Sequence, residues 1–256
     1  MAGMIEARTL SYRHDGKSPW LFRDLSFRLE TGHTLALLGR NGRGKTTLLR
    51  CLAGLLAPGA GTVLRSGAVG YVPQHFTSPF PYTVHDVVLM GRARHIGLLS
   101  NPTGKDRLRV KEALEAIGLI AFADRRIDTL SGGERQLALI ARALASEAEI
   151  LLLDEPASAL DYHNQALILA LLRRLARERG LTIVMTTHDP SHALEIAERA
   201  VLLHGNGLAE EGPIELVCRE DRLTALYDIT MRRLDFGSKD GASVSAIVPH
   251  YGSLNR

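Results

Sequence analysis

Hydrophobic and polar positions alternate near the amino terminus of the chain. Residues 5 to 30 contain a turn signal at Asp15-Gly16, followed by apolar side chains at period two: Leu25, Phe27 and Leu29. Such alternation places every second side chain on one face of a strand, and an Asp-Gly pair favours a tight turn. The pattern therefore predicts an antiparallel pair of strands in this region.

Short apolar runs of a different kind follow. They cover residues 34–39, 69–72, 150–154, 182–188 and 200–205. The later runs are apolar throughout, and helical patterns such as "ALILALLRRLARERG" separate them. Strands that are apolar on both faces are typical of a sheet covered by helices on each side. These runs therefore predict an α/β fold.

The spacing of the runs also predicts how the chain is divided. Residues 76–145 hold helical patterns and loops punctuated by Pro and Gly, with no convincing strand. We therefore expect a helical subdomain inserted into a core made of residues 1–75 and 146–218, the three parts forming one domain over 1–218. Residues 219–256 have few apolar periodicities, so we expect a small and partly mobile extension.

Composition excludes several classes of protein. The chain has 256 residues, of which 45% are hydrophobic and 23% charged, enough to bury a substantial core. Lys and Arg exceed Asp and Glu by only 31 to 28, spread along the chain, which does not favour nucleic acid as a partner. Cys51 and Cys218 are too few and too far apart for a metal cluster or a disulfide framework. The amino terminus has no apolar signal core, and no stretch approaches the roughly 18 apolar residues of a membrane span, so we expect a cytosolic protein.

A phosphate-binding loop is predicted at Gly39 to Thr46, which matches G-x-x-x-x-G-K-[ST]. An apolar strand precedes the motif and a helix with leucines on one face follows it, as this loop requires. Its glycines let backbone N–H groups wrap phosphates, Lys45 reaches the outer pair, and the Thr46 hydroxyl binds Mg²⁺. The alternative, a simple glycine-rich turn, does not account for the strand and helix on either side.

Two further strands end in residues suited to phosphate chemistry. Asp154 and Glu155 follow the apolar run at 150, and His188 ends the next one. We expect Asp154 to hold Mg²⁺ through water, Glu155 to act as general base for the attacking water, and His188 to contact the γ-phosphate. Alone, the carboxylates would be a solvated edge and the histidine structural. The phosphate loop favours the catalytic interpretation.

The stretch "TLSGGERQLALIARAL" (129–144) predicts a second anion site. Ser131 and Glu134 form a capping box at the start of an amphipathic helix. Capping does not explain Gly132 and Gly133, each of which costs up to about 1 kcal/mol relative to Ala in a helix. Glycine suits close approach to the backbone, and a helix N-terminus favours phosphate. We therefore expect this segment of one chain to close over the phosphate loop of another in a head-to-tail dimer.

Taken in order, these motifs resemble the ATP-binding subunit of an ABC transporter over residues 4–218. The resemblance is carried by "GRNGRGKTT", Gln74, "LSGGERQ", "LLLDEP", "SALD" and His188. It implies a P-loop NTPase with a RecA-like mixed-sheet core, an N-terminal antiparallel β subdomain and the inserted helical subdomain. It also implies ATP and Mg²⁺ as cofactors and a homodimer with two ATP sites.

The resemblance assigns roles to individual residues. Those expected to bind nucleotide are Tyr12, Gly39, Asn41, Gly42, Gly44, Lys45, Thr46, Thr47, Ser131, Gly132, Gly133 and Asp161. Tyr12 matches the aromatic that stacks on adenine, although alone it would pass for a core residue of the N-terminal sheet. Asp161 matches the aspartate that links the two sites of the dimer. The expected catalytic residues are Glu155, His188 and Gln74, and the expected metal-binding residues are Thr46, Gln74 and Asp154.

The segment after Gln74, "VPQHFTSPFPYTVHDVVLMGRARHIGLL", bears on the cargo. It resembles bacterial importers for iron-siderophore, haem, cobalamin and molybdate or tungstate, and looks most like the molybdate/tungstate subunits. The resemblance implies that this segment docks onto polytopic permease subunits, with a periplasmic binding protein as an indirect partner. It implies a peripheral location on the cytoplasmic face of the inner membrane.

Two alternatives predict other features. A soluble ABC ATPase that acts on DNA or ribosomes would normally carry two nucleotide sites in one chain, a long coiled coil or zinc cysteines, none of which the sequence contains. A P-loop kinase or GTPase has no role for "LSGGERQ", and the guanine signature N-K-x-D is absent. The sequence therefore favours an importer ATPase.

Overall fold

The computed structural model describes residues 3–97, 100–237 and 243–253. Its largest sheet has six strands in the order β5-β6-β7-β3-β8-β9. Five of them run parallel and the edge strand β9 is antiparallel to β8. The strands are β3 (Thr34–Leu38), β5 (Val69–Val72), β6 (Ile150–Leu153), β7 (Thr182–Thr187), β8 (Arg199–Gly205) and β9 (Leu208–Pro213).

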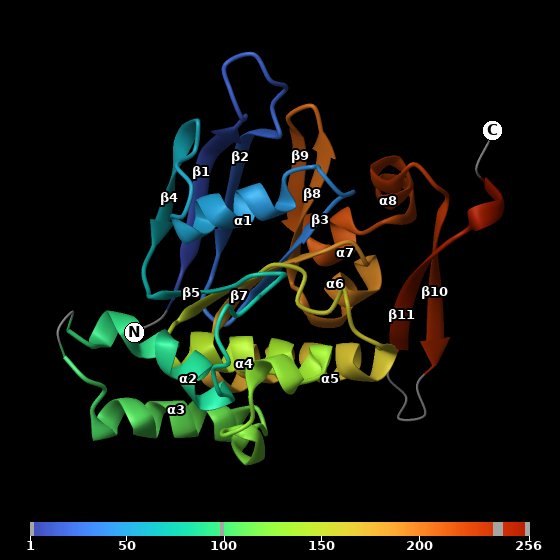
Figure 1. The fold of residues 1–256 in the computed structure, drawn as a ribbon. Coiled ribbons are helices and arrows are strands. Elements are labelled where there is room, and N and C mark those ends of the chain that lie inside the picture. The colour runs from blue at the N-terminus through green and yellow to red at the C-terminus, as the bar shows by residue number, and fades with distance from the viewer. Residues whose placement is uncertain (1–2, 98–99, 238–242, 254–256) are drawn as a thin grey trace.

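The short apolar runs form the interior of this sheet. Every residue of β3, β6 and β7 is buried. Helix α1 (Lys45–Ala53) packs on one face of the sheet, and α4 (Gly132–Ala145) and α5 (Tyr162–Arg179) pack on the other (Figure 1). Burial on both faces is why these strands lack alternation. The predicted α/β P-loop fold is confirmed, and the parallel strands bring their carboxyl ends to one edge.

A second sheet lies beside the first (Figure 1). It has the order β2-β1-β4, with strands β1 (Ile5–Tyr12), β2 (Phe22–Leu29) and β4 (Ala60–Arg65). Leu25 and Leu29 of β2 are paired with Leu10 and Ile5 of β1, so the alternating apolar positions face one core that also contains α1. The predicted antiparallel pair is confirmed, whereas β4 was missed because its residues are mostly exposed.

Helices make up most of the described part of residues 76–145. They are α2 (Val84–Leu89), α3 (Gly104–Ala116), α4 and the short turns η1 (Met90–His95), η2 (Ile120–Phe122) and η3 (Ile127–Thr129). Within the described residues of this segment, the one strand-like feature is an isolated β-bridge between Thr83 and Arg126. This composition agrees with a helical insertion, and its boundaries stay a prediction.

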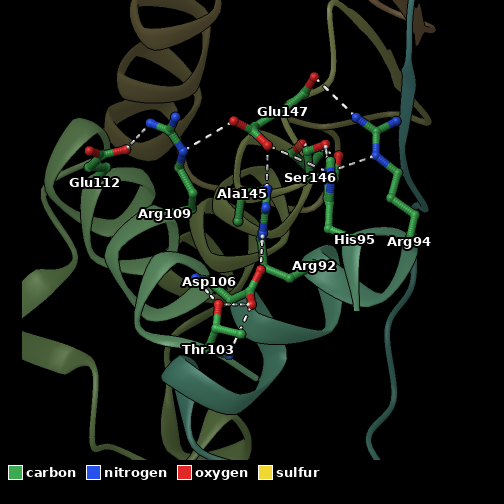
Figure 2. Close-up of polar contacts among 11 residues, drawn as sticks. Arg92, Arg94, His95, Thr103, Asp106, Arg109, Glu112, Ala145, Ser146 and Glu147 are labelled. Atoms are coloured by element: carbon green, nitrogen blue, oxygen red, sulfur yellow. Dashed lines mark hydrogen bonds and ion pairs between the residues drawn. The ribbon is translucent and has the colours of Figure 1, made fainter. Parts of the chain in front are cut away.

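Arg92 of η1 ties three of these helical elements together (Figure 2). Its guanidinium is 2% exposed and donates to Asp106 at the start of α3 over 3.1 Å. It also donates to the carbonyl of Ala145, the last residue of α4, at 2.8 Å and to the carboxylate of Glu147, two residues later, at 2.7 Å. A buried cation is stable only when it is paired in this way. The cluster therefore fixes the end of α4 that lies away from Ser131.

The C-terminal extension contains more regular structure than its sequence indicates. After α6 (Pro190–Ile196) and α7 (Ile214–Val217) come α8 (Glu220–Tyr227), β10 (Met231–Gly237), β11 (Ser243–Pro249) and η4 (Tyr251–Ser253). Side chains of α8, β10 and β11 join the main core: Leu223, Leu226, Met231 and Ile247. The expected mobility of the extension concerns in part residues 238–242 and 254–256, which lie outside the described residues.

Among the residues described, no helix combines the length and apolar character needed to cross a membrane.

Candidate functional site

The phosphate loop leaves the carboxyl end of β3 and enters α1. Gly42 and Gly44 have φ values of 77° and 94°, a region that side chains with a Cβ rarely adopt. A Cβ on Gly39 would come within 2.7 Å of the carbonyl oxygen of Leu203, so the loop can follow this path only with glycine there. Apart from Gly42 itself and its two chain neighbours, no described residue has an atom within 4 Å of a Cβ built there, so the loop faces open space at this point.

Lys45 begins helix α1 and bends back over this loop. Its side chain is 6% exposed, and its ammonium donates to the carbonyl of Gly39 at 2.8 Å. The same nitrogen lies 3.5 Å from a carboxylate oxygen of Glu155. A cation at this position can hold an anion lying on the loop.

Asp154, at the end of β6, is held by two hydroxyl groups. Thr46 of α1 donates to its Oδ1 at 3.0 Å, and Thr186 of β7 donates to the same oxygen at 2.7 Å. The residue is 3% exposed. Mg²⁺ prefers few protein oxygens and completes its shell with water and phosphate oxygens, so the Thr46 hydroxyl and the Asp154 carboxylate fit this ion. The described residues contain no cluster of three or more His, Cys, Asp or Glu that could hold a metal.

Glu155 is the residue on which the catalytic candidates converge. Gln74 Nε2 and His188 Nδ1 each lie 3.3 Å from its Oε2, and Lys45 approaches its Oε1. Its φ of 47° is unusual for a residue with a side chain and costs on the order of 1–3 kcal/mol. The backbone N–H of Glu155 donates to the Thr186 hydroxyl at 2.7 Å and so holds this conformation. As a result the carboxylate, 11% exposed, points into the space above the phosphate loop.

A cavity of about 370 Å³ opens above the loop. Eight of its lining residues were predicted from the sequence: Asn41, Gly42, Gly44, Lys45, Thr46, Thr47, Gln74 and Glu155. His14 and Leu21 also line it and were missed. The one available signal for His14 was its position two residues after Tyr12.

Tyr12 is not among the residues that line this cavity. Its ring stacks on Phe22 with centroids 6.2 Å apart and meets the ring of His14 edge-on at 5.6 Å. The half-buried ring therefore contacts two neighbouring rings, and its stacking on adenine stays a prediction. His14 is the aromatic side chain that faces the cavity.

The structure contains the predicted capping box at Ser131. The Ser131 hydroxyl accepts from the Glu134 N–H at 3.3 Å, and the Glu134 carboxylate accepts from the Ser131 N–H at 2.8 Å. The bond from the Ser131 backbone, followed by that from its hydroxyl, lowers the pKa of Glu134. The two glycines that follow differ. A Cβ on Gly133 would lie 2.8 Å from the Asn164 side chain, whereas one on Gly132 would make an ordinary 3.4 Å contact with Leu160.

The two glycines therefore support an approaching phosphate unequally. Gly133 has a second explanation within the chain, its packing against the Asn164 side chain, whereas its contact with phosphate stays a prediction. Gly132 keeps that interpretation, because nothing nearby in the described chain requires a glycine there. Gly132 lines a neighbouring cavity of about 320 Å³ that shares Gln74 and Glu155 with the first.

The other predicted residues of the second anion site lie apart from the phosphate loop. Ser131, Gly132 and Gly133 do not line the phosphate-loop cavity of their own chain as described. Asp161 caps α5 by accepting from the Asn164 N–H at 2.8 Å and from its side chain at 2.9 Å, and these bonds hold the pKa of Asp161 below its usual value. Within the described part of one chain, the predicted residues that gather at the phosphate loop are Gly39, Asn41, Gly42, Gly44, Lys45, Thr46, Thr47, Gln74, Asp154, Glu155 and His188.

Comparisons with known proteins agree with this geometry. The family model described as ABC transporter matches residues 22–158. The molybdate import ATP-binding protein MolC of Haemophilus influenzae is 44% identical over 212 residues, which are 83% of this chain and 83% of that protein. The hemin import ATP-binding protein HmuV of Rhodopseudomonas palustris is 36% identical, over 90% of each chain.

Solved structures are similar as well. A chain of a metal-chelate type ABC transporter in an inward-facing conformation superposes with a TM-score of 0.93 and 39% identity, covering 97% of this chain and 98% of that one. A dimeric post-hydrolysis state of an ATP-binding cassette bound to ADP and phosphate gives a TM-score of 0.69 and 27% identity, covering 82% of this chain and 98% of the other.

Proposed function

Since the chain belongs to the ABC transporter family, and to its ATP-hydrolysing subunits, we propose that it powers a bacterial importer for a metal oxyanion or metal chelate. The observation that carries the proposal is the convergence of Lys45, Gln74 and His188 on the Glu155 carboxylate above the phosphate loop. A cation, a carboxylate and two hydrogen-bonding side chains in that arrangement suit hydrolysis of a bound nucleoside triphosphate.

We assign ATP binding to the loop from Gly39 to Thr47. Its backbone N–H groups and Lys45 hold the phosphates, and Asn41 and Thr47 complete the wall of the cavity. The nucleotide base is proposed to lie toward the N-terminal sheet, where His14 reaches the cavity with Tyr12 packed behind it. Thr46, Asp154 and Gln74 are the residues proposed to hold Mg²⁺. When bound, the ion neutralises charge on the phosphate oxygens.

Hydrolysis requires a base near the terminal phosphate. Glu155 is proposed to accept a proton from the attacking water at its carboxylate, which the Thr186 contact and the positive φ aim into the cavity. His188 and Gln74, each 3.3 Å from that carboxylate, orient it and the water. His188 is further proposed to contact the γ-phosphate.

The active form is proposed to be a homodimer. The N-terminus of α4, with Ser131, Gly132 and Gly133, has no place in the phosphate-loop cavity of its own chain as described. We assign it to the γ-phosphate bound on the partner's loop, where a helix N-terminus favours an anion. Asp161 is proposed to link the two sites. ATP would then close the dimer and hydrolysis would reopen it.

Within this class the proposed cargo is molybdate or tungstate, ahead of iron-siderophore, haem or cobalamin. The proposal rests on the segment after Gln74 and on the likeness to a molybdate importer subunit. The proposed partners are polytopic permease subunits and, indirectly, a periplasmic binding protein, with no role for nucleic acid. The chain would then lie peripherally on the cytoplasmic face of the membrane.

Co-expression with the membrane-protein genes that neighbour its own gene tests this function. We expect the tagged chain to co-purify with a polytopic permease from detergent-solubilised membranes and to drive ATP-dependent molybdate uptake into vesicles that contain the binding protein. Uptake of an iron chelate instead of molybdate would change the cargo. A chain recovered without any membrane partner, yet active as an ATPase, would favour a soluble ABC ATPase.

A further inference from the structure

Helix α6, which begins two residues after His188, rests on the C-terminal hairpin formed by β10 and β11 (Figure 1). Ser191, in the first turn of α6, makes two hydrogen bonds with one residue of β11. Its hydroxyl donates to the carbonyl of Ile247 at 3.2 Å and accepts from the N–H of Ile247 at 3.1 Å. One hydroxyl therefore satisfies both backbone groups of Ile247 and fixes the separation of the helix and the strand.

The hairpin is itself anchored by further contacts. Met231 and Ile247 are 5% and 4% exposed and belong to the same core as Ala193 of α6. The Arg233 N–H donates to the Glu220 carboxylate at 2.7 Å, and the Arg233 guanidinium pairs with Glu215 at 2.7 Å. Through these contacts the hairpin is a fixed support rather than a hanging tail.

The orientation of His188 depends on the backbone segments on either side of it. Its side chain is 53% exposed, so packing around the ring does little to orient it. The segment that carries it is short: Thr187 ends β7, and Pro190 begins α6. Asp189 bridges the two ends, since its N–H donates to the Thr187 hydroxyl at 3.1 Å and its carboxylate accepts from the Ser191 N–H at 2.8 Å.

The position of His188 therefore follows from the positions of β7 and α6. Strand β7 is fixed because it pairs with β3 and β6 inside the sheet. Helix α6 has seven residues and is held in part by the hairpin. A shift of its first turn would move His188 relative to the Glu155 carboxylate, which lies 3.3 Å away.

We infer that Ser191 is a positioning residue for ATP hydrolysis, through which the C-terminal hairpin holds His188 against Glu155. The inference rests on the proposed role of His188 in hydrolysis. It gives the C-terminal extension a function at the nucleotide site. In the chain, α6, β8, β9 and α7 separate this extension from His188, the last predicted residue of the site. Displacing a group at the reacting centre by a fraction of an ångström lowers the rate without weakening substrate binding that occurs elsewhere.

The test is a double-mutant cycle on the purified full-length chain, with kcat and KM for ATP measured for Ser191→Ala, His188→Ala and the double variant. We expect Ser191→Ala to lower kcat roughly three- to tenfold with an unchanged KM, as for a misplaced catalytic group. Ser191→Thr, which keeps the hydroxyl, should restore most of kcat. In the His188→Ala background, Ser191→Ala should have little further effect, since residues that act through one another are not additive.

Ser146→Ala is the matched control, because it removes a half-buried serine hydroxyl that caps the Ala143 carbonyl far from His188. It should leave kcat unchanged, and thermal unfolding will show whether either serine variant is merely less stable. Additive effects in the cycle, or an Ala variant with normal kcat, would overturn the inference and leave the role of His188 intact. If His188→Ala itself hydrolyses ATP normally, both that role and the inference fail.

Discussion

At the scale of single residues, Glu155 combines an unusual backbone conformation with close contacts in the site. A left-handed backbone at a residue with a side chain is retained where the surrounding structure enforces it, here through the Thr186 hydroxyl. That hydroxyl also holds Asp154, so one side chain of β7 orients both carboxylates. The two acids, to which separate tasks are assigned in the proposal, therefore share one support.

Replacing Glu155 by Gln tests its assignment as the base. The amide keeps the size of the side chain and its contacts with Gln74 and His188 but cannot accept a proton, so turnover should fall by roughly two orders of magnitude or more. Binding of ATP, measured by fluorescence titration with a labelled analogue, should stay within about twofold because the phosphate loop is intact. ATP should trap this variant as a dimer in size-exclusion chromatography. Near-normal hydrolysis would mean that another group is the base.

At the scale of elements, the first turn of helix α4 contains two glycines with different surroundings. Gly133 packs against another part of the chain, whereas Gly132 has only a proposed functional role. Gly133→Ala should destabilise the chain by about 1 kcal/mol or more, because its Cβ would lie 2.8 Å from an Asn164 side chain that is already bonded to Asp161. Gly132→Ala meets only an ordinary contact and should keep or slightly raise the melting temperature. Hydrolysis by Gly132→Ala should nevertheless slow about tenfold or more, if phosphate must approach that backbone.

Differential scanning fluorimetry and a phosphate-release assay on the two variants separate these effects. A Gly132→Ala protein with unchanged stability and normal hydrolysis would leave helix capping as the whole purpose of the segment. Parallel losses of stability and rate in both variants would have the same meaning.

The elements also show what a sequence can and cannot predict. The buried strands and the phosphate loop could be predicted because their signals are local: an apolar run, or glycines at fixed spacing. Strand β4 and the C-terminal hairpin could not, since exposed or short strands carry little periodicity and are stabilised by their neighbours. Arg92 was missed for a related reason: its partners Asp106 and Glu147 lie on separate elements, and only the fold brings these charges together (Figure 2).

At the scale of the whole molecule, the proposed dimer completes a site that one chain supplies only in part. Lys45, Asp154, Glu155 and His188 gather at the carboxyl edge of the six-stranded sheet, whereas the N-terminus of α4 does not line the phosphate-loop cavity of the chain as described. A symmetric dimer that presents each α4 to the partner's loop would complete two equal sites. This arrangement predicts how chains with a defective phosphate loop behave when they are mixed with chains whose α4 N-terminus is defective.

Chains with Lys45→Ala and chains with Gly132→Val should each hydrolyse ATP slowly alone, because both sites of each homodimer carry one defect. In a heterodimer of the two, one site has both defects and the other has neither. If one intact site suffices, an equal mixture should recover about a quarter of the unmodified rate, since half of the randomly formed dimers carry one good site of two. Assembly within a single chain predicts instead that the mixture gives only the mean of the two slow rates.

Strict cooperation between two sites could suppress this recovery, so the mixing result is paired with a crosslink. Cysteines at the exposed position 129 of one chain, which leaves Ser131 and both glycines intact, and at position 41 of the other should join in the Glu155→Gln background only when ATP is present, because ATP closes the dimer. The native Cys51 and Cys218 are buried, and burial raises the pKa of their thiols to about 11 and about 12, so they should react little. A crosslink without recovery would mean that both sites must be intact for turnover. If the mixture shows no crosslink and no recovery, "LSGGERQ" acts within its own chain, and the basis for the dimer is removed.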